Sequence, residues 1–370
     1  MLLGMPGPFE PPFAPIEWGM ESRPRVCLVM CFRNEAAHLP AVLATLAAQT
    51  TDHDRLHLIA VDDRSNDGSG AIVEDWLARG DIGGCVMRAE FGSIPHALNL
   101  ALTAIGSEDY VVRLDAHTLY EPKYVELVLS AFAALGPDAW CVGTSETPGP
   151  ADSFGKALHA ALFTNPMGLG PADYRSKGAR IVKSVYLGAW RPGVLQRLGG
   201  YDPRWSANED AELAERIRRA GGQVVRIDAR AEKIMTRGAL SALRQWSRYG
   251  FWRAQTLKYH RSALGLRHVA PPAALLAALC LLVSPARAWL VPAYLAYALA
   301  IVALRARNEA PFVTLATIFY FPLVHCGYAL GILTGLLANP IKRRSLRHEG
   351  TPEVVHRGDF SGRRKMVRTE

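Results

Sequence analysis

The stretch Tyr110-Val-Val-Arg-Leu-Asp-Ala-His-Thr-Leu-Tyr-Glu-Pro122 joins a short apolar run to a group of polar side chains. Its first residues predict a buried strand that ends at Asp115. Side chains two apart on a strand point to the same face, so Asp115 and His117 converge if strand geometry continues. A carboxylate oxygen and an imidazole nitrogen suit manganese better than calcium. An isolated D-x-H is more often a strand-end cap with a surface histidine, so the interpretation depends on the rest of the chain.

Apolar runs of strand length alternate with segments of helical spacing on both sides of this stretch. The expected strands are 26–31, 58–61, 85–87, 110–114 and 140–143, and the expected helices are 36–49, 70–79, 97–105 and 206–220. This alternation is typical of an α/β doubly wound sheet, whose ligands bind beyond the carboxyl ends of the strands. Asp62, Asp63, Asp115 and His117 all follow a strand and are expected at that edge.

The turn after the first strand reads Cys31-Phe-Arg-Asn-Glu35 and lacks the G-x-G-x-x-G of a dinucleotide dehydrogenase. The polar, glycine-rich passage between about residues 144 and 180 predicts a mobile substrate region. The helix that follows has Ser206 or Asn208 as N-cap and carries Glu209 and Asp210 in its first turn. The helix dipole alone favours acidic residues there, so a purely structural role stays open at this point.

The 370-residue chain carries a formal charge of +8, which favours an anionic partner. Its six cysteines show no C-x-x-C spacing and are expected to be reduced and apolar in role. Between residues 237 and 269 the chain is basic and free of acids, with Trp246, Tyr249, Phe251 and Trp252 interleaved. Such a surface fits nucleic acid or a membrane interface. The uncharged runs that follow favour the membrane and argue against nucleic acid.

Residues 288–304 and 310–341 are uncharged and long enough to cross a bilayer. We expect spans near 288–304 and 311–338, with 269–286, which contains prolines, interfacial or re-entrant. Basic residues directly follow the last run and predict a cytoplasmic C-terminus. The predicted organisation is an irregular N-terminal arm (1–24), a catalytic domain (25–235), basic amphipathic interface helices (236–268), a membrane region (269–341) and a basic cytoplasmic tail (342–370). The catalytic domain is expected on the cytoplasmic face of the cell membrane.

A nucleotide-diphosphate sugar becomes a good electrophile once a metal takes up charge on its diphosphate. The acceptor hydroxyl then needs a base, and a carboxylate suits this role. The sequence resembles a family 2 glycosyltransferase with the GT-A fold, most like the succinoglycan-biosynthesis ExoA-type branch. The resemblance covers about residue 25 to the last apolar run. It rests on Asn34-Glu35, Val61 to Ser69, Ala97-Leu-Asn99, Asp115-Ala-His117, Tyr186 to Arg191, Asn208-Glu-Asp210 and Gln245 to Tyr249.

The resemblance implies a role for each matching residue. Asp210 is the expected base, with Glu209 beside it at the acceptor. Asp115 and His117 are the expected ligands of Mn²⁺ or Mg²⁺. The nucleotide sugar, with a UDP-sugar as first expectation, would contact Asn34, Glu35, Asp62, Asp63, Asn99, Asp115 and Arg248. The acceptor and diphosphate side would involve Gln245, Arg248, Tyr249 and Trp190. The expected reaction is an inverting transfer to a membrane-held, polyprenyl-diphosphate-linked saccharide in exopolysaccharide or glycan assembly.

The sequence departs from the family pattern at a few positions. Ile94 lies near the usual place of a phosphate-binding lysine, so either Arg88 or His96 substitutes, or the metal and Arg248 mainly hold the diphosphate. Tyr249 replaces the tryptophan of Q-x-x-R-W, which weakens the case for processive synthesis. Two alternatives remain open: a processive polysaccharide synthase, and an inactive nucleotide-sugar-binding membrane component.

Overall fold

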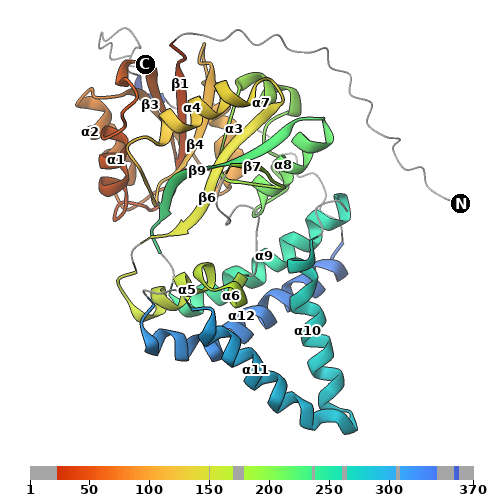
Figure 1. Cartoon of the computed structure of the whole chain (residues 1–370). Coiled ribbons are helices and arrows are strands. Elements are labelled where there is room, and N and C mark those ends of the chain that lie inside the picture. Colours follow the sequence, from red (N-terminus) through yellow and green to blue (C-terminus); the bar gives the residue numbers. More distant parts are fainter. Residues whose placement is uncertain are drawn as a thin grey trace, which may run out of the picture.

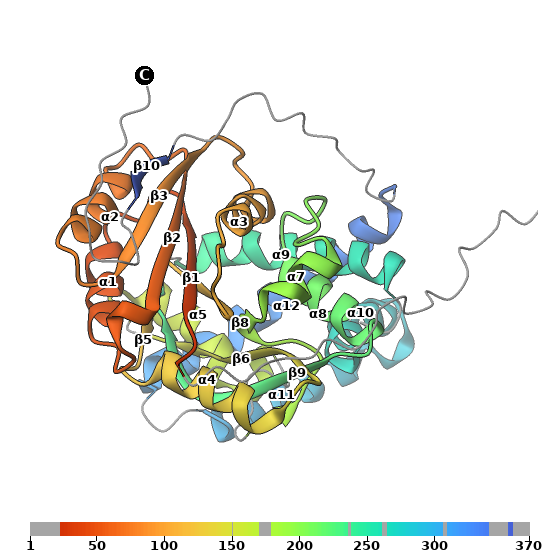
Figure 2. The same cartoon turned by 90° about the horizontal axis from the view of Figure 1, so that it is seen from above.

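The computed structural model describes residues 23–149, 151–169, 179–235, 238–260, 265–305, 309–339 and 354–357. The predicted arm, except for its last two residues, and most of the predicted tail therefore lie outside the described residues. An α/β domain forms one end of the molecule, and a set of long helices lies beneath it (Figure 1). Figure 2 shows the same domain from above.

The first half of the sheet is parallel and matches the predicted alternation. Its strands are β1 (Val26–Phe32), β2 (Leu56–Asp63), β3 (Gly83–Ala89) and β4 (Tyr110–Asp115), in the order β3-β2-β1-β4. Between them run α1 (Leu39–Ala47), α2 (Ser69–Ala78) and α3 (Ile94–Thr103). Strand β1 is buried almost throughout because both of its faces are covered.

The second half of the sheet is mixed. Strand β8 (Tyr186–Trp190) lies antiparallel between β4 and β6 (Ala139–Pro148). The long strand β9 (Gln223–Lys233) pairs parallel with β6 and antiparallel with β5 (Thr118–Tyr120). Two short strands pair antiparallel at other edges: β7 (Arg180–Ile181) with β9, and β10 (Val354–Arg357) with β3.

Helices cover both faces of the sheet. One apolar core joins α1, α2 and α4 (Tyr124–Leu135) to alternate residues of β1, including Leu28 and Met30. The other core joins α3, α7 (Pro192–Leu198) and α8 (Glu209–Arg219) to the residues between them, such as Val29. This three-layer arrangement follows from the period-two side-chain alternation of strands.

The prediction of a mobile substrate region is wrong for residues 151–169. This segment forms α5 (Phe154–Thr164) and α6 (Pro166–Leu169). Leu158 and Leu162 of α5 pack with Phe321 and Val324 in a third apolar cluster, which is why the segment is ordered. Residues 170–178, the rest of the predicted region before β7, lie outside the described residues.

The C-terminal part consists of long helices. They are α9 (Ala239–Tyr259), α10 (Leu266–Leu282), the 3₁₀ turn η4 (Pro285–Trp289), α11 (Leu290–Ala303) and α12 (Pro311–Leu337). Two stretches, Pro285–Ala303 and Pro311–Leu337, are long and apolar enough to cross a membrane. They coincide with the two predicted spans. The region 269–286 belongs to α10, a continuous helix that contains Pro271 and Pro272.

Candidate active site

The carboxyl ends of the central strands bring most of the predicted site residues to one edge of the sheet. In the register of β1 with its neighbours, Cys31 is level with Asp115 on β4, and Phe32 is level with Asp62 on β2. Thr118 on β5 pairs with Lys233 at the end of β9. The second half of the sheet therefore adds a lysine, which was not among the predicted site residues, beside the predicted metal ligands.

The turn after β1 is fixed to the turn after β2. Asn34 has a left-handed backbone with φ of 55°, and its side-chain oxygen accepts the N–H of Asn66 at 2.9 Å. The backbone N–H groups of Asn34 and Glu35 donate to Ser65 Oγ at 3.0 Å and Ser69 Oγ at 2.8 Å. These bonds direct the Glu35 carboxylate toward the site, where its Oε1 lies 3.0 Å from His117 Nδ1.

The predicted nucleotide-binding residues Asp62 and Asp63 are buried and engaged with backbone. Asp62 Oδ1 accepts the N–H of Ser65 at 2.9 Å. Each oxygen of Asp63 accepts one N–H, from Gly92 and from Ser93, both at 2.9 Å. Asp63 thus shapes the turn that leads into α3, and its contact with a nucleotide base stays a prediction.

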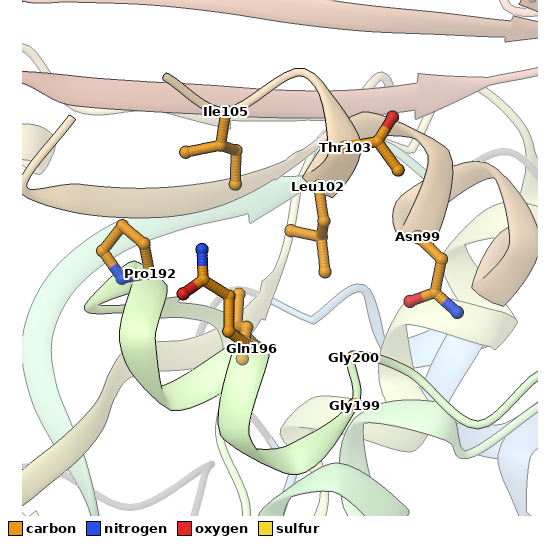
Figure 3. Close-up of a pocket in the computed structure, with 9 residues that line it drawn as sticks. Asn99, Leu102, Thr103, Ile105, Pro192, Gln196, Gly199 and Gly200 are labelled. Carbon is orange, nitrogen blue, oxygen red and sulfur yellow. The ribbon is translucent and has the colours of Figure 1, made fainter. Parts of the chain in front are cut away.

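Asn99 lies on α3, where both ends of its side chain bond the backbone of one residue. Its Nδ2 donates to the Tyr201 carbonyl at 2.7 Å, and its Oδ1 accepts the Tyr201 N–H at 2.8 Å. Asn99 also lines a pocket of about 280 Å³ between α3 and α7, shown in Figure 3. The other lining residues are mostly apolar and include none of the acidic side chains of the site. We therefore place the chemistry at the strand ends and not in this pocket.

Arg113 connects the predicted metal ligand to the predicted base. It lies two residues before Asp115 on β4, and only 9% of its side chain is exposed. Its guanidinium donates to Asp115 Oδ1 at 3.4 Å, to Glu209 Oε1 at 3.3 Å, and through a shorter bond to Asp210. This arginine belongs to the stretch from Tyr110 to Pro122, but no role was predicted for it. The available signal was a charged residue inside an otherwise apolar strand, two positions from Asp115 and so on the same face.

Burial and the surrounding charges shift the pKa values of Asp115 and Asp210 in opposite directions. Burial raises the pKa of Asp210 to about 7, with Arg113 opposing the shift and the charges of Glu209 and Asp115 adding to it. Burial would also raise the pKa of Asp115, but Arg113, His117 and Lys233 hold it below its usual value. The pKa of Arg113 would fall through burial, yet the surrounding carboxylates raise it well above its ordinary value. Asp115 is thus charged at neutral pH, whereas Asp210 exchanges its proton near neutrality.

A second cation lies on the other side of Asp115. Lys233 Nζ is 2.8 Å from Glu146 Oε1 and 5.5 Å from the centre of the Tyr186 ring. The Tyr186 hydroxyl donates to Asp115 Oδ2 at 3.4 Å. Burial would lower the pKa of Lys233, but Glu146, Tyr249 and Asp115 raise it, so the lysine stays charged. Lys233 and Arg113 together offer two fixed positive charges at the site.

Helix α9 holds the segment that presents Glu209 and Asp210. Asn208 has φ of 62° at the start of α8, and its Nδ2 donates to the Tyr249 carbonyl at 3.3 Å. The exposed Arg248 donates to the Ser206 carbonyl, and Gln245 Nε2 donates to the Tyr249 hydroxyl at 2.7 Å. Three of the four residues predicted at the acceptor and diphosphate side therefore belong to the helix that supports the predicted base.

Trp190 is placed differently from the other predicted acceptor residues. It is 3% exposed and meets the Tyr201 ring edge-on, with 6.1 Å between ring centres. Tyr201 in turn lies 5.9 Å from the Arg113 guanidinium. Any influence of Trp190 on an acceptor would pass through these neighbours. Of the two predicted lysine substitutes, Arg88 pairs with Glu74 at 2.8 Å, and His96 Nδ1 lies 2.8 Å from Ser93 Oγ.

The donor atoms of Asp115 and His117 fit a divalent metal that the substrate helps to bind. Contact with Glu35 through Nδ1 leaves Nε2 of His117 for an ion, and a carboxylate behind a histidine is the usual support of a ligating imidazole. Among the described residues, no group of three or more His, Cys, Asp or Glu side chains is arranged to hold an ion. Such an ion would need diphosphate oxygens and water to complete its coordination.

The chain belongs to glycosyltransferase family 2. The glycosyl transferase family 2 model matches residues 27–189, which cover the strands from β1 to β8 except the first residue of β1 and the last of β8, and the site residues up to Asp115 and His117. The chain is also 31% identical over 246 residues to the succinoglycan biosynthesis protein ExoA of Rhizobium meliloti (strain 1021), covering 64% of this chain and 72% of that protein.

A solved structure supports the GT-A fold. The mannosyltransferase PcManGT from Pyrobaculum calidifontis, in complex with GDP-Man and Mn²⁺, superposes with a TM-score of 0.56. The match covers 84% of this chain and 87% of that one, at 21% sequence identity. The predicted fold class and family are thereby confirmed, while the roles of the individual site residues stay predictions.

Proposed function

We propose that this protein transfers one sugar, with inversion, from a nucleotide-diphosphate sugar to a saccharide held at the membrane on a polyprenyl diphosphate. The observation that carries the proposal is the Arg113 cluster, which joins Asp115, Glu209 and Asp210. It brings the predicted metal ligand and the predicted base into one site at the strand ends. The likeness to a protein of succinoglycan biosynthesis supports a role in exopolysaccharide assembly.

In the proposed reaction, the acceptor hydroxyl attacks the anomeric carbon from the face opposite the diphosphate. The new C–O bond forms as the bond to the diphosphate oxygen breaks, and the hydroxyl proton passes to a carboxylate oxygen of Asp210. A carboxylate with a pKa near 7 is well matched to this task. Arg113 positions Asp210, and Lys233 and Arg248 supply positive charge for the anionic donor.

Asp115 and His117 would hold the divalent metal. The bound ion would neutralise charge that develops on the departing nucleoside diphosphate. Because PcManGT forms a complex with GDP-Man and Mn²⁺, we propose Mn²⁺ as the first ion to test. The donor panel should contain UDP-sugars first and GDP-mannose beside them.

Replacing Asp210 by Asn tests the proposed base. We expect the variant to bind the nucleotide sugar almost as well as the wild type and to lose roughly 10²–10⁴-fold in turnover. Donor binding by calorimetry and release of nucleoside diphosphate in membranes with lipid extract measure the two quantities. Asp138→Asn, which changes an exposed aspartate outside the site, is the matched control. Equal loss of binding and turnover in Asp210→Asn would contradict the proposed role.

Product length separates single transfer from processive synthesis. We expect products extended by one sugar, whereas a processive synthase would give a ladder of longer chains. A complete lack of nucleoside diphosphate release across the donor panel, in the presence of Mn²⁺ and lipid extract, would instead support an inactive nucleotide-sugar-binding component.

A further inference from the structure

Helix α9 is attached to the catalytic domain through its second half. Arg248 donates to the Ser206 carbonyl, and the Tyr249 carbonyl accepts from Asn208. Near the other end of α9, Thr256 Oγ1 accepts the Trp205 indole N–H at 2.9 Å. These contacts fix the direction of α9 along the surface of the water-soluble domain. A helix held in this way cannot also run across a bilayer.

Helix α12 runs beside α9 in the same direction. The Tyr320 hydroxyl donates to the Ala239 carbonyl at 3.3 Å, and Lys258 donates to the Ala338 carbonyl at the other end. The helices thus stay together over about 19 residues of α12, roughly 28 Å at 1.5 Å per residue. Figures 1 and 2 both show the pair side by side. A helix that pointed away from the domain would touch α9 at one crossing only.

The packing of these two helices leaves no room between their backbones. A Cβ atom on Gly331 would lie 2.0 Å from the Ser247 carbonyl oxygen, and one on Gly250 would lie 2.2 Å from the Tyr328 carbonyl oxygen. Another face of α12 is exposed, and its exposed large apolar residues include Phe312, Leu315, Phe319, Leu323, Leu330 and Leu337. Helix α12 therefore has one face on α9 and one face suited to the boundary of a membrane.

Helices α10 and α11 are exposed over almost their whole length. No residue from Val269 to Ala300 is buried, in a stretch that the structure describes throughout. Within the 18-residue apolar segment of Pro285–Ala303, only 6% is buried, against 39% in the corresponding segment of Pro311–Leu337. The two helices extend away from the catalytic domain and meet at a tip on the far side of the molecule (Figure 1).

The lengths and charges of this hairpin fit a lipid bilayer. Helix α10 contains 17 residues and α11 contains 14, and the second arm reaches 19 residues together with the 3₁₀ turn at the tip. The arms with this turn are about 25 to 29 Å long, close to the roughly 30 Å hydrocarbon layer. The exposed side chains within the arms are apolar, such as Leu276, Leu279, Leu295 and Leu299. Arg287 and the exposed Trp289 lie at the tip, whereas Arg305 lies at the base, so charge is confined to the two ends.

We propose that the α10–α11 hairpin crosses the bilayer and that α12 lies at the membrane surface beneath α9 without crossing. After α12 the chain returns to the catalytic domain, because β10 pairs with β3. The number of crossings must therefore be even. The proposal replaces the expectation that α11 and α12 cross while 269–286 stays interfacial, since that arrangement would point α12 away from the domain to which α9 is bound.

Three cysteine reporters distinguish the possible topologies. The full chain would carry Cys31, Cys280 and Cys326 replaced by Ala, because the other three native cysteines are buried. Single cysteines are then placed at the hairpin tip (Val283→Cys), after α11 (Leu304→Cys) and after Glu370. Val283 is 87% exposed and Leu304 is 47% exposed, and neither change removes a basic residue. Asp138→Cys marks the side of the catalytic domain. An impermeant maleimide is applied to sealed membrane vesicles before and after detergent.

The proposal predicts that position 283 is labelled from the side opposite residue 138, and that position 304 and the C-terminal cysteine are labelled from the same side as residue 138. Crossing by α11 and α12 would reverse the results at 283 and 304 and overturn the proposal. Three crossings would move the C-terminal cysteine to the far side, which would also overturn it. If positions 283 and 304 are both labelled from the catalytic side, the hairpin is re-entrant, and this result would also overturn the proposal. Labelling requires no activity, so this result is independent of the proposed transferase reaction.

Discussion

At the scale of single residues, the proton equilibrium of Asp210 depends on opposing neighbours. Burial, Glu209 and Asp115 raise its pKa, and Arg113 lowers it, with the balance at about 7. Only the ionised carboxylate accepts a proton, so the active fraction increases as pH rises. A bound nucleotide sugar and its metal ion would add negative and positive charge near Asp210. The pKa of Asp210 is therefore best measured in the free enzyme.

The pH dependence of kcat/KM should report this balance. We expect the wild-type value to rise through about pH 7 and to level off above it, since kcat/KM follows the free enzyme. Arg113→Gln removes the charge that lowers the pKa of Asp210, so the rising limb should move to higher pH.

Arg113→Lys keeps the positive charge but lacks the planar guanidinium group. The pH at which its kcat/KM rises should therefore stay near that of the wild type, although its rate falls. Arg79→Gln, at an exposed arginine beside the end of α2, should leave the profile unchanged. A limb that stays at the same pH in Arg113→Gln would show that the arginine does not set the protonation of the base.

The metal dependence of nucleotide-sugar binding tests whether His117 is a metal ligand. We expect His117→Ala to weaken nucleotide-sugar affinity most at low Mn²⁺ and to recover partly when Mn²⁺ is raised, because one protein ligand is lost. Calorimetric titrations at several Mn²⁺ concentrations measure the effect. His53→Ala, at the 3₁₀ turn before β2, is the control. An unchanged Mn²⁺ dependence in His117→Ala would remove this residue from the ligand set.

At the scale of elements, α9 is the link between the C-terminal apolar helices and the site. It contacts the 206–208 segment that leads into Glu209 and Asp210, and it packs on α12 through glycines. A displacement of α9 should therefore move the predicted base, Asp210, even when no residue of the site itself is substituted.

Gly331→Ala tests this link. The added methyl group would meet the Ser247 carbonyl, so α12 must shift, at a cost of about 1–3 kcal/mol in the free energy of unfolding. We expect a lower unfolding temperature in detergent and a reduced kcat. Gly238→Ala is the matched control, because φ there is −75° and a Cβ would meet nothing within 4 Å. If both variants unfold at the wild-type temperature, the close contact of α9 and α12 is not a structural constraint.

At the scale of the whole molecule, one part buries its apolar residues and the other part exposes them. The catalytic domain buries its apolar residues in two cores on either side of the sheet. The α10–α11 hairpin instead exposes its leucines, and an exposed apolar surface of this kind is typical of a membrane or protein interface.

Charged residues in the hairpin should weaken its insertion. Each lysine near the centre of a span costs roughly 2.5–3.5 kcal/mol. We expect the double variant Leu276→Lys, Leu295→Lys to resist alkaline extraction from membranes less well than the wild type, while its catalytic domain still binds nucleoside diphosphate. Leu240→Lys changes an even more exposed leucine on α9, outside the hairpin, and should be retained like the wild type. Equal retention of both variants would contradict insertion.

Local patterns in the sequence determined the strands from β1 to β4, the helices between them, and the edge at which Asp115 lies. Continuous apolar runs and caps are properties of neighbouring residues, so they can be recognised without tertiary contacts. Asp210 was singled out in the same way, at a helix start and through a family motif. The two apolar helices at the C-terminal end were also recognised from length and lack of charge alone.

Tertiary structure alone decided which groups meet. Arg113 and Asp210 are 97 residues apart, and Glu35 and His117 are 82 apart, so no local pattern could pair them. The ordering of α5 depends on contacts with α12 that lie far along the chain. The direction of α12 was equally invisible, because an apolar helix packed on α9 and one that crosses a bilayer have the same composition. Only the contacts between distant helices distinguish them.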